Sequence, residues 1–267
     1  DRFFSLHKFF LDDPQDLQRI YGLHRSAVTY LEEHIGLRFP KELRDPQDVR
    51  ELFLLASIKQ GFSRFQILAC VILKLMHVMH HLDAAELRFQ IPLSEAALLD
   101  AAANQIEKAA DLMMSSGLAV HSFYGNRKSR NSIITKLLAK RENIAATVFD
   151  KLRFRIITDK EGDILPTLVW LSRNLFPFNY VIPNQSSNSL MSFEQMIDPE
   201  YLDDLRSILM SNGIDSKEEL TEDPKNTFSG KSYKIINFIV DLPVRIDHLV
   251  NLNDNTLGKV VFVMVEF

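Results

Sequence analysis

This sequence is poor in cysteine, in long apolar runs and in excess charge of either sign. Its one cysteine, Cys70, rules out a disulfide within the chain and predicts a reducing, cytoplasmic location. Because Cys70 lies in an apolar stretch, we expect it to be a small buried residue. The longest apolar run, residues 67–79, is interrupted by Lys74 and is too short to span a bilayer, so we expect no membrane segment.

Acidic and basic residues nearly balance, with 35 Asp and Glu against 31 Lys and Arg and a net charge of −4. The molecule as a whole therefore does not attract nucleic acid, and any site for an anion must come from a local basic cluster. Hydrophobic residues make up 46%, enough for a core in one large domain or two smaller ones. The chain opens at Asp1 without a methionine and closes at Phe267 within an apolar run, so we expect both ends to be trimmed.

The spacing of apolar residues changes near residue 120, and the chain before that point has the pattern of helices. Two similar start signals, Asp13-Pro14 and Asp45-Pro46, each predict a capped helix. A long apolar helix is predicted over residues 63–88, followed by another from Ser94 to Gly117. The first 120 residues are therefore expected to form a helical N-terminal region.

After residue 120, helices alternate with β-branched runs. Strands are predicted at residues 153–158, 232–241 and 259–267, and a helix over 165–175. A long polar insertion lies at 184–230. This alternation predicts an α/β (α+β) fold in which a domain with a mixed β-sheet, residues 121–267, follows the helical region 1–120.

Basic residues are concentrated between Arg127 and Arg141, where six occur and no acidic residue interrupts them. Lys128, Ser132 and Lys136 recur every four residues, so they share one side of a helix whose opposite side carries apolar residues that can pack inward: Ile133, Ile134, Leu137 and Leu138. A helix start with free N–H groups, a hydroxyl and lysines is a cradle for polyphosphate. A solvated basic helix face is the alternative.

The order of these residues resembles the synthetase domain of the RelA/SpoT family. Lys128-Ser129-x-x-Ser132-Ile133-x-x-Lys136 is followed by Asp150-x-x-x-x-Arg155-Ile156-Ile157, as in the signature of that family. The resemblance implies a nucleotidyltransferase-like sheet and transfer of pyrophosphate from ATP to the 3′-hydroxyl of GDP or GTP. It also implies the following roles: ATP phosphates on Arg127, Lys128, Ser132 and Lys136, Arg155 on the donor side, and Mg2+ on Asp150.

The end of the chain resembles the second half of the same signature. Pro224-Lys225 precedes Ser232-Tyr233, and by the resemblance Tyr233 stacks on guanine while Lys231 serves as the loop lysine. Asn237 stands where the family usually has His. Glu266 corresponds to the strand glutamate that binds Mg2+ or activates the acceptor hydroxyl, and the chain ends one residue later. Asp150 and Glu266 are therefore expected to converge beside the start of the basic helix.

Three departures keep other functions open. Asn126 replaces an arginine of the family pattern, Ser232 replaces the loop glycine and Asn237 replaces the histidine. The same chemistry on another acceptor, an adenine nucleotide or the 3′ end of tRNA, is one alternative. A catalytically inactive nucleotide-binding regulator is another. The expected partners are thus ATP and a guanine nucleotide, with tRNA as an alternative acceptor, and an oligomer is compatible with the sequence.

The individual site residues also have ordinary structural explanations. Asp150 could end a helix, Glu266 could be an outward strand residue and Tyr233 a cross-strand packing partner. His77 and His81, four residues apart, share a helix face and could bind a metal, but no further ligands are evident. We therefore interpret these histidines as structural or phosphate-facing and expect no hydrolase activity.

Overall fold

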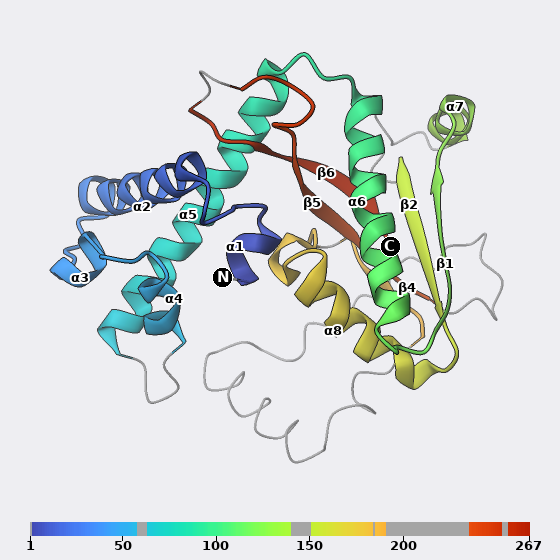
Figure 1. Cartoon of the computed structure of the whole chain (residues 1–267), viewed down its shortest axis with the longest axis horizontal. Helices are drawn as coiled ribbons and strands as arrows, with labels where there is room; N and C mark the ends of the chain where they lie inside the picture. The colour runs from blue at the N-terminus through green and yellow to red at the C-terminus, as the bar shows by residue number, and fades with distance from the viewer. Residues whose placement is uncertain (1, 58–62, 140–150, 184, 191–234, 253–255) are drawn as a thin grey trace. The chain divides into compact units, whose positions relative to one another are not determined.

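The computed structural model describes residues 2–57, 63–139, 151–183, 185–190, 235–252 and 256–267. Figure 1 shows the elements in chain order. They are α1 (Arg2–Leu6), α2 (Pro14–His34), α3 (Lys41–Arg44), α4 (Glu51–Ala56), α5 (Arg64–Gln90), α6 (Glu95–Ser115), β1 (Val120–Arg127), α7 (Arg130–Ala139), β2 (Leu152–Thr158), η2 (Glu161–Asp163), α8 (Ile164–Asn174), η3 (Phe178–Tyr180), β3 (Ser187–Asn188), β4 (Ile236–Asn237), β5 (Ile239–Arg245) and β6 (Val260–Glu266). The chain is thus a mixed α/β protein, in agreement with the α+β class predicted from the sequence.

The chain forms two compact units, each built from separate stretches of sequence. Unit 1 contains Asp1–Met113, Val169–Tyr180 and Asp241–Met264. Unit 2 contains Met114–Leu168, Val181–Val240 and Val265–Phe267. The first stretch of unit 1 corresponds closely to the helical region expected over residues 1–120. Unit 1 also takes in later stretches of chain, and strands β5 and β6 each run from one unit into the other.

The helices of unit 1 pack around α5, which contacts α2, α3 and α4 (Figure 1). Apolar residues recur on α2 at the spacing of one helix face, and Ile20, Leu23, Ala27 and Leu31 are all buried there. They meet Ile72 and its neighbours on α5 in one hydrophobic core. The amphipathic pattern of the sequence therefore dictates which face of each helix points inward.

Side-chain caps explain the starts of α2, α5 and α6. Asp13 caps α2 as predicted, because its side chain accepts a hydrogen bond from the N–H of Gln15 at 2.9 Å. Ser63 caps α5 by accepting from Gln66 at 3.2 Å, and Ser94 accepts from Ala97 at 3.1 Å at the start of α6. The expected helix at Asp45-Pro46 is wrong. Asp45 instead ends α3, and the next helix begins only at Glu51.

Helix α5 covers the helix predicted over residues 63–88 but differs from two other expectations. It is 27 residues long, and its mean hydropathy of 1.5 makes it long and apolar enough to cross a membrane by composition alone, although no membrane segment was expected. A single helix of this kind is weak evidence, because core helices meet the same criterion. Cys70 lies exposed on α5, so the expectation that it is buried is wrong.

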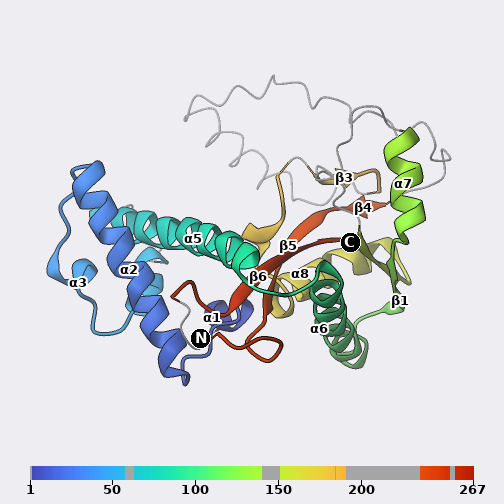
Figure 2. The ribbon, with the colours of Figure 1, turned by 90° about the horizontal axis from the view of Figure 1, so that it is seen from above.

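The main sheet is mixed, with the strand order β1-β2-β6-β5. Strand β1 is antiparallel to β2, and β2 is parallel to β6. Main-chain hydrogen bonds between Phe238 and Phe267 and between Ile246 and Lys259 show that β5 runs antiparallel to β6. Figure 2 shows β5 and β6 side by side. The short strands β3 and β4 form a separate antiparallel pair.

One face of the unit 2 strands is aromatic. The ring of Phe154 on β2 stacks on Phe123 of β1, with centroids 5.4 Å apart, and on Phe267, at 5.9 Å. Phe267 in turn stacks on Phe238 at 5.6 Å. Because successive side chains of a strand point to opposite faces, the residues on either side of each phenylalanine point the other way. That opposite face carries the candidate site.

Candidate functional site

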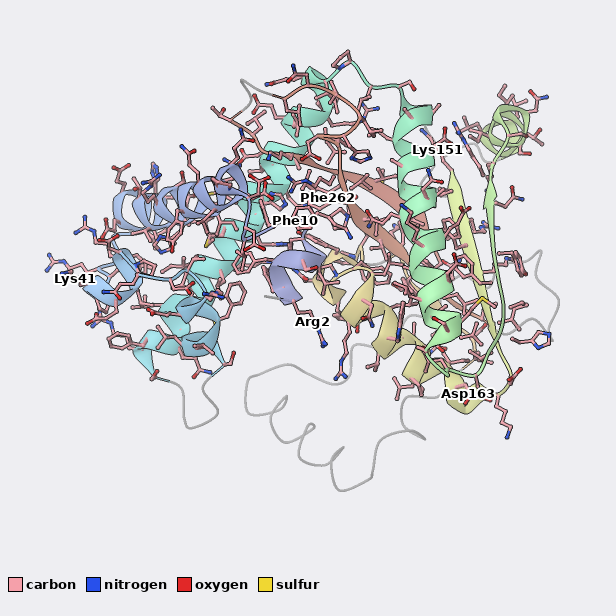
Figure 3. The ribbon with its side chains drawn as sticks, in the orientation of Figure 1. Arg2, Phe10, Lys41, Lys151, Asp163 and Phe262 are labelled. Atoms are coloured by element: carbon pink, nitrogen blue, oxygen red, sulfur yellow. The ribbon has the colours of Figure 1, made fainter. Side chains whose placement is uncertain are left out.

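The start of β2 lies beside two segments that are far from each other in the sequence, the residues just after β1 and the end of β6. The N–H of Lys128, just after β1, donates to the carbonyl of Lys151 at 3.0 Å. Arg153 is the register partner of Glu266 on the parallel strand β6. Figure 3 labels Lys151 where β2 begins. The start of the basic helix segment and the carboxylate of the last strand therefore meet the same short stretch of β2.

Glu266 is a buried carboxylate with a hydrogen bond to each oxygen. The residue is 7% exposed. Its Oε2 accepts from Nη2 of Arg153 at 3.0 Å, and its Oε1 accepts from Nδ2 of Asn237 at 2.6 Å. A buried carboxylate needs a charged or hydrogen-bonding partner, and Glu266 has both. We call Arg153, Asn237 and Glu266 the carboxylate triad.

The neighbours of the triad follow from strand register. Asn126 on β1 is the register partner of Arg153, and Tyr124 is the partner of Arg155. Residues two apart on a strand share a face, so one sheet face presents two rows, Asn126 with Arg153 and then Tyr124 with Arg155. Tyr124 and Arg155 are exposed. This face therefore combines two guanidinium groups, an amide and an accessible aromatic ring.

Helix α7 begins next to this face with a serine cap. Ser129 Oγ accepts from the N–H of Ser132 at 3.2 Å, and the two hydroxyl oxygens are 2.9 Å apart. Lys128 is half-buried, while Ser129 and Ser132 are exposed. The hydroxyl of Ser132, which was predicted to bind phosphate, therefore contacts the capping hydroxyl in the first turn of α7, three residues after the Lys128-Ser129 pair.

The other predicted phosphate ligands have different positions. Arg127 is the last residue of β1 and is exposed, so it belongs to the strand rather than to the basic helix. Lys136 lies one turn beyond Ser132 on α7. Asp150, Lys231 and Tyr233 lie outside the described residues. The expected approach of Asp150 to Glu266 is thus untested, although Glu266 does lie beside Arg153, three residues after Asp150 in the sequence.

The inner side of α7 is narrower than predicted. Ile133 and Leu137 are half-buried, whereas Ile134 is 44% exposed and Leu138 is 80% exposed. The expectation that all four residues pack inward is therefore wrong for two of them. Each of these two directly follows a half-buried residue, so its side chain points further round the helix, toward solvent.

Sequence reasoning missed Arg153. Only Arg155 matched a motif, yet Arg153 is the residue that binds Glu266. The alternation Arg153-Phe154-Arg155 was a usable signal, because in a strand it places both arginines on the face opposite a buried phenylalanine. The partner of Arg153, 113 residues away, could not be read from the local pattern.

The expected Mg2+ site is tested here only for Glu266. Within the described ranges, no group of three His, Cys, Asp or Glu side chains is arranged to hold a metal ion. Carboxylate oxygens are the ligands that Mg2+ prefers, but both oxygens of Glu266 already accept hydrogen bonds and Arg153 balances its charge. The described residues alone therefore do not fit a magnesium site.

The α5 histidines belong to unit 1. His77 and His81 pack against each other with ring centroids 4.6 Å apart, and His81 stacks on Phe262 of β6 at 4.0 Å.

Comparison with known proteins assigns no family to this chain. Neither a protein-family model, nor a curated protein, nor a solved structure matches this chain.

Proposed function

We propose that unit 2 is a divergent, nucleotidyltransferase-like pyrophosphokinase of the RelA/SpoT kind, which transfers pyrophosphate from ATP to the 3′-hydroxyl of a guanine nucleotide. One observation carries the proposal. The segment that begins with Lys128 and the strand that ends with Glu266 both bind the first residues of β2. These are the segments that should hold the donor phosphates and the acceptor hydroxyl.

The cationic groups of the site suit the donor. Pyrophosphoryl transfer requires neutralisation of phosphate charge and alignment of the two reacting oxygens rather than covalent help from the protein. Lys128 and Ser132 lie at the start of α7, where helix N–H groups also favour an anion. Arg155 is exposed on the same strand as Arg153. A triphosphate lying between α7 and β2 would therefore meet positive charge from both elements.

The role proposed for Glu266 is to accept the proton of the acceptor hydroxyl. Each of its oxygens accepts one hydrogen bond, and the carboxylate would become a stronger base if Arg153 exchanged from Glu266 to a phosphate. Arg153 is suited to that exchange, since a guanidinium binds phosphate as readily as carboxylate. The Mg2+ dependence expected from the sequence rests on Asp150 together with Glu266, and when bound the ion would neutralise phosphate charge.

The test is a transfer assay with labelled ATP and separation of the products. With GDP or GTP as acceptor, the unaltered chain should form a product that carries the β- and γ-phosphates of ATP. Glu266→Gln and Lys128→Ala should each reduce the rate by about 100-fold or more. Lys41→Ala is the matched control, because Lys41 is an exposed lysine of α3 in unit 1 (Figure 3). Equal rates in all four proteins would refute the assignment.

A second acceptor class is tested in the same assay. Asn237 gives one of its two amide N–H groups to Glu266, so only the other N–H and the amide oxygen remain for a base. An adenine nucleotide or the 3′ end of tRNA should therefore be compared with GDP as acceptor. Product with one of these acceptors alone would keep the chemistry and change the substrate.

An inactive nucleotide-binding regulator is the second candidate function, and the carboxylate triad favours it. Among the described residues, Glu266 is the buried carboxylate of the site, and its pairing with Arg153 makes it a weaker proton acceptor. Such a protein would bind a non-hydrolysable ATP analogue and form no product with any acceptor. Any product that depends on Glu266 would exclude this alternative.

A further inference from the structure

A second group of polar side chains, some buried and some half-buried, lies in unit 1, away from any role in the proposed transfer. His7 follows α1, His77, His80 and His81 lie on α5, and Tyr180 ends η3. We call these residues the histidine cluster. The ring of Tyr180 lies 4.8 Å from His7, 5.1 Å from His77 and 4.8 Å from His81, measured between centroids. Three segments of unit 1 therefore meet through aromatic contacts.

The cluster ties the N-terminal segment to α5. Phe3 stacks on His7 with centroids 3.8 Å apart, and Phe9 contacts His80 at 4.9 Å. His7 Nδ1 bonds to the carbonyl of Phe3 at 2.8 Å, which fixes the ring against its own helix. Residues 3–9 thus reach α5 chiefly through histidine and phenylalanine rings.

Several polar atoms of the cluster have no protein partner. His7 Nε2, His81 Nε2, Tyr180 Oη and both ring nitrogens of His80 are buried without a hydrogen bond. A buried imidazole without an acceptor is tolerated only when it is neutral, because a buried unpaired charge is far more costly than a buried neutral ring. The geometry therefore requires the cluster to remain uncharged while residues 3–9 are packed against α5.

Burial also favours the neutral form of these histidines. It lowers the pKa of His7 and of His81 to about 4 from the usual 6.5, and it lowers the pKa of His80 well below that value. The pKa of His77 is also lowered, chiefly by burial, with Lys74 adding to the effect.

The charged groups around the cluster do not offset this effect. Lys74 on α5 and Arg19 on α2 face the histidines with positive charge, and Arg19 is already paired with Asp83. Lys8 follows His7 in the N-terminal segment. Asp241 on β5 lies 3.9 Å from His81 Nδ1, which is too long for a hydrogen bond.

Protonation of Asp241 in acid opposes the destabilising effect of histidine protonation. Burial raises its pKa to about 6, so Asp241 loses its charge before the histidines take up protons. A carboxyl with a raised pKa favours the folded state as the pH falls, whereas imidazoles with lowered pKa values disfavour it. One carboxyl opposes four imidazoles, and the balance therefore lies with the histidines.

We propose that the histidine cluster is an acid-released clamp, which holds residues 3–9 on α5 at neutral pH and frees them when its imidazoles take up protons. The stabilisation is fully present above the unfolded pKa of histidine and is lost as the pH falls toward the folded values. For His7 alone, with a folded pKa of about 4 against 6.5, opening should become at least about tenfold more frequent between about pH 7 and about pH 5.

Amide hydrogen exchange measured by mass spectrometry tests the clamp in the whole chain. The amides of His7 and Phe9 are bonded to Phe3 and Phe4, so their protection reports the packing of this segment. After correction for the intrinsic effect of pH, protection of residues 3–9 should fall by about tenfold or more from about pH 7 to about pH 5. In His7→Phe/His81→Phe the fall over the same pH range should be at least about tenfold smaller than in the unaltered chain, because two of the four imidazoles can no longer take up protons.

His248→Phe is the matched control, because the side chain of His248 is 63% exposed in the same unit. It should retain the full pH response of the unaltered chain. If the double variant does not fold, proton NMR titration of the unaltered chain decides instead, and the imidazoles of His7 and His81 should remain neutral down to about pH 5.5 and take up protons only at lower pH. Normal titration near the ordinary histidine pKa, or protection that does not depend on pH, would overturn the proposal.

Discussion

The two units bury polar side chains in opposite ways. In unit 1 the histidine cluster leaves ring nitrogens without partners, and burial lowers the histidine pKa values so that the rings are neutral. In unit 2 Glu266 keeps Arg153 and Asn237 as partners on its two oxygens. An imidazole can discharge when it leaves water, whereas an arginine cannot, so a buried arginine requires a carboxylate. The stability of unit 1 should therefore depend on proton uptake by its histidines, and the stability of the unit 2 site should depend on charge pairing.

Arg245 limits the contrast, because unit 1 also contains one strongly paired arginine. Its side chain is 11% exposed and binds Asp13 at 2.9 Å, Asp247 at 2.7 Å and Asp16. Asp16 is itself 4% exposed at its side chain. Arg245→Met should lower the free energy of unfolding by about 3–5 kcal/mol, because it leaves Asp16 buried with weaker partners.

Denaturant unfolding at neutral pH measures this loss. Arg44→Met is the matched control, since Arg44 pairs with Glu32 while its own side chain is 63% exposed. Its unfolding midpoint should stay unchanged within error. A loss of equal size in both variants would show that burial does not decide the strength of these pairs.

The carboxylate triad provides the corresponding test in unit 2. Arg153→Leu should cost about 2–4 kcal/mol at neutral pH, because Glu266 then remains buried with only the amide of Asn237. Arg153→Leu/Glu266→Gln should recover more than half of that loss, since the second change removes the unpaired charge. Chemical denaturation of the two single variants and the double variant measures the coupling, and additive losses would contradict a charge pair.

Substitution of one glycine in each unit should change the stability of the protein in opposite directions. A Cβ added at Gly125 would overlap the ring of Phe154, which is 1% exposed and stacked on both sides. Gly125→Ala should therefore destabilise the protein by about 1–3 kcal/mol. In α2, a Cβ at Gly22 meets nothing within 4 Å, and Gly22→Ala should stabilise by about 0.5–1 kcal/mol. Thermal unfolding of both variants checks the opposite signs.

A change in pH dependence is expected at Asp241. Its pKa is raised to about 6 by burial, so its contribution to stability is present below the unfolded pKa and is lost as the pH rises through about 6. Asp241→Asn removes that loss. The variant should gain about 1–2 kcal/mol relative to the unaltered chain between about pH 4 and about pH 7. Denaturation over that range measures it, and a constant difference would show that Asp241 does not titrate with a raised pKa.

The features that the sequence predicted well are those that depend on near neighbours. Asp13, Ser63 and Ser94 cap their helices through bonds to the second or third residue onward, so three or four letters contain the whole interaction. Asp45-Pro46 has the same letters as Asp13-Pro14 but follows helix α3, which ends at that point. Its surroundings, and not its local chemistry, determine its role.

The site shows the same limit. Lys128, Arg155 and Glu266 were singled out because each belongs to a motif, and their positions before α7, on β2 and on β6 depend on strands that pair over long distances. Strand β1 was missed, because Val120–Arg127 contains a glycine and several polar residues and gains its regularity from pairing with β2. Arg153 was missed for the related reason that its partner lies on another strand.

The interrupted make-up of the two units has a consequence for how this protein can be cut or recombined. The chain passes from one unit to the other after residues 113, 168, 180, 240 and 264. No single break in the polypeptide releases a whole unit, and a fragment that stops at residue 113 lacks the tyrosine and the aspartate that complete the surroundings of the histidines. Neither unit can therefore be transferred to another protein as one continuous stretch of sequence.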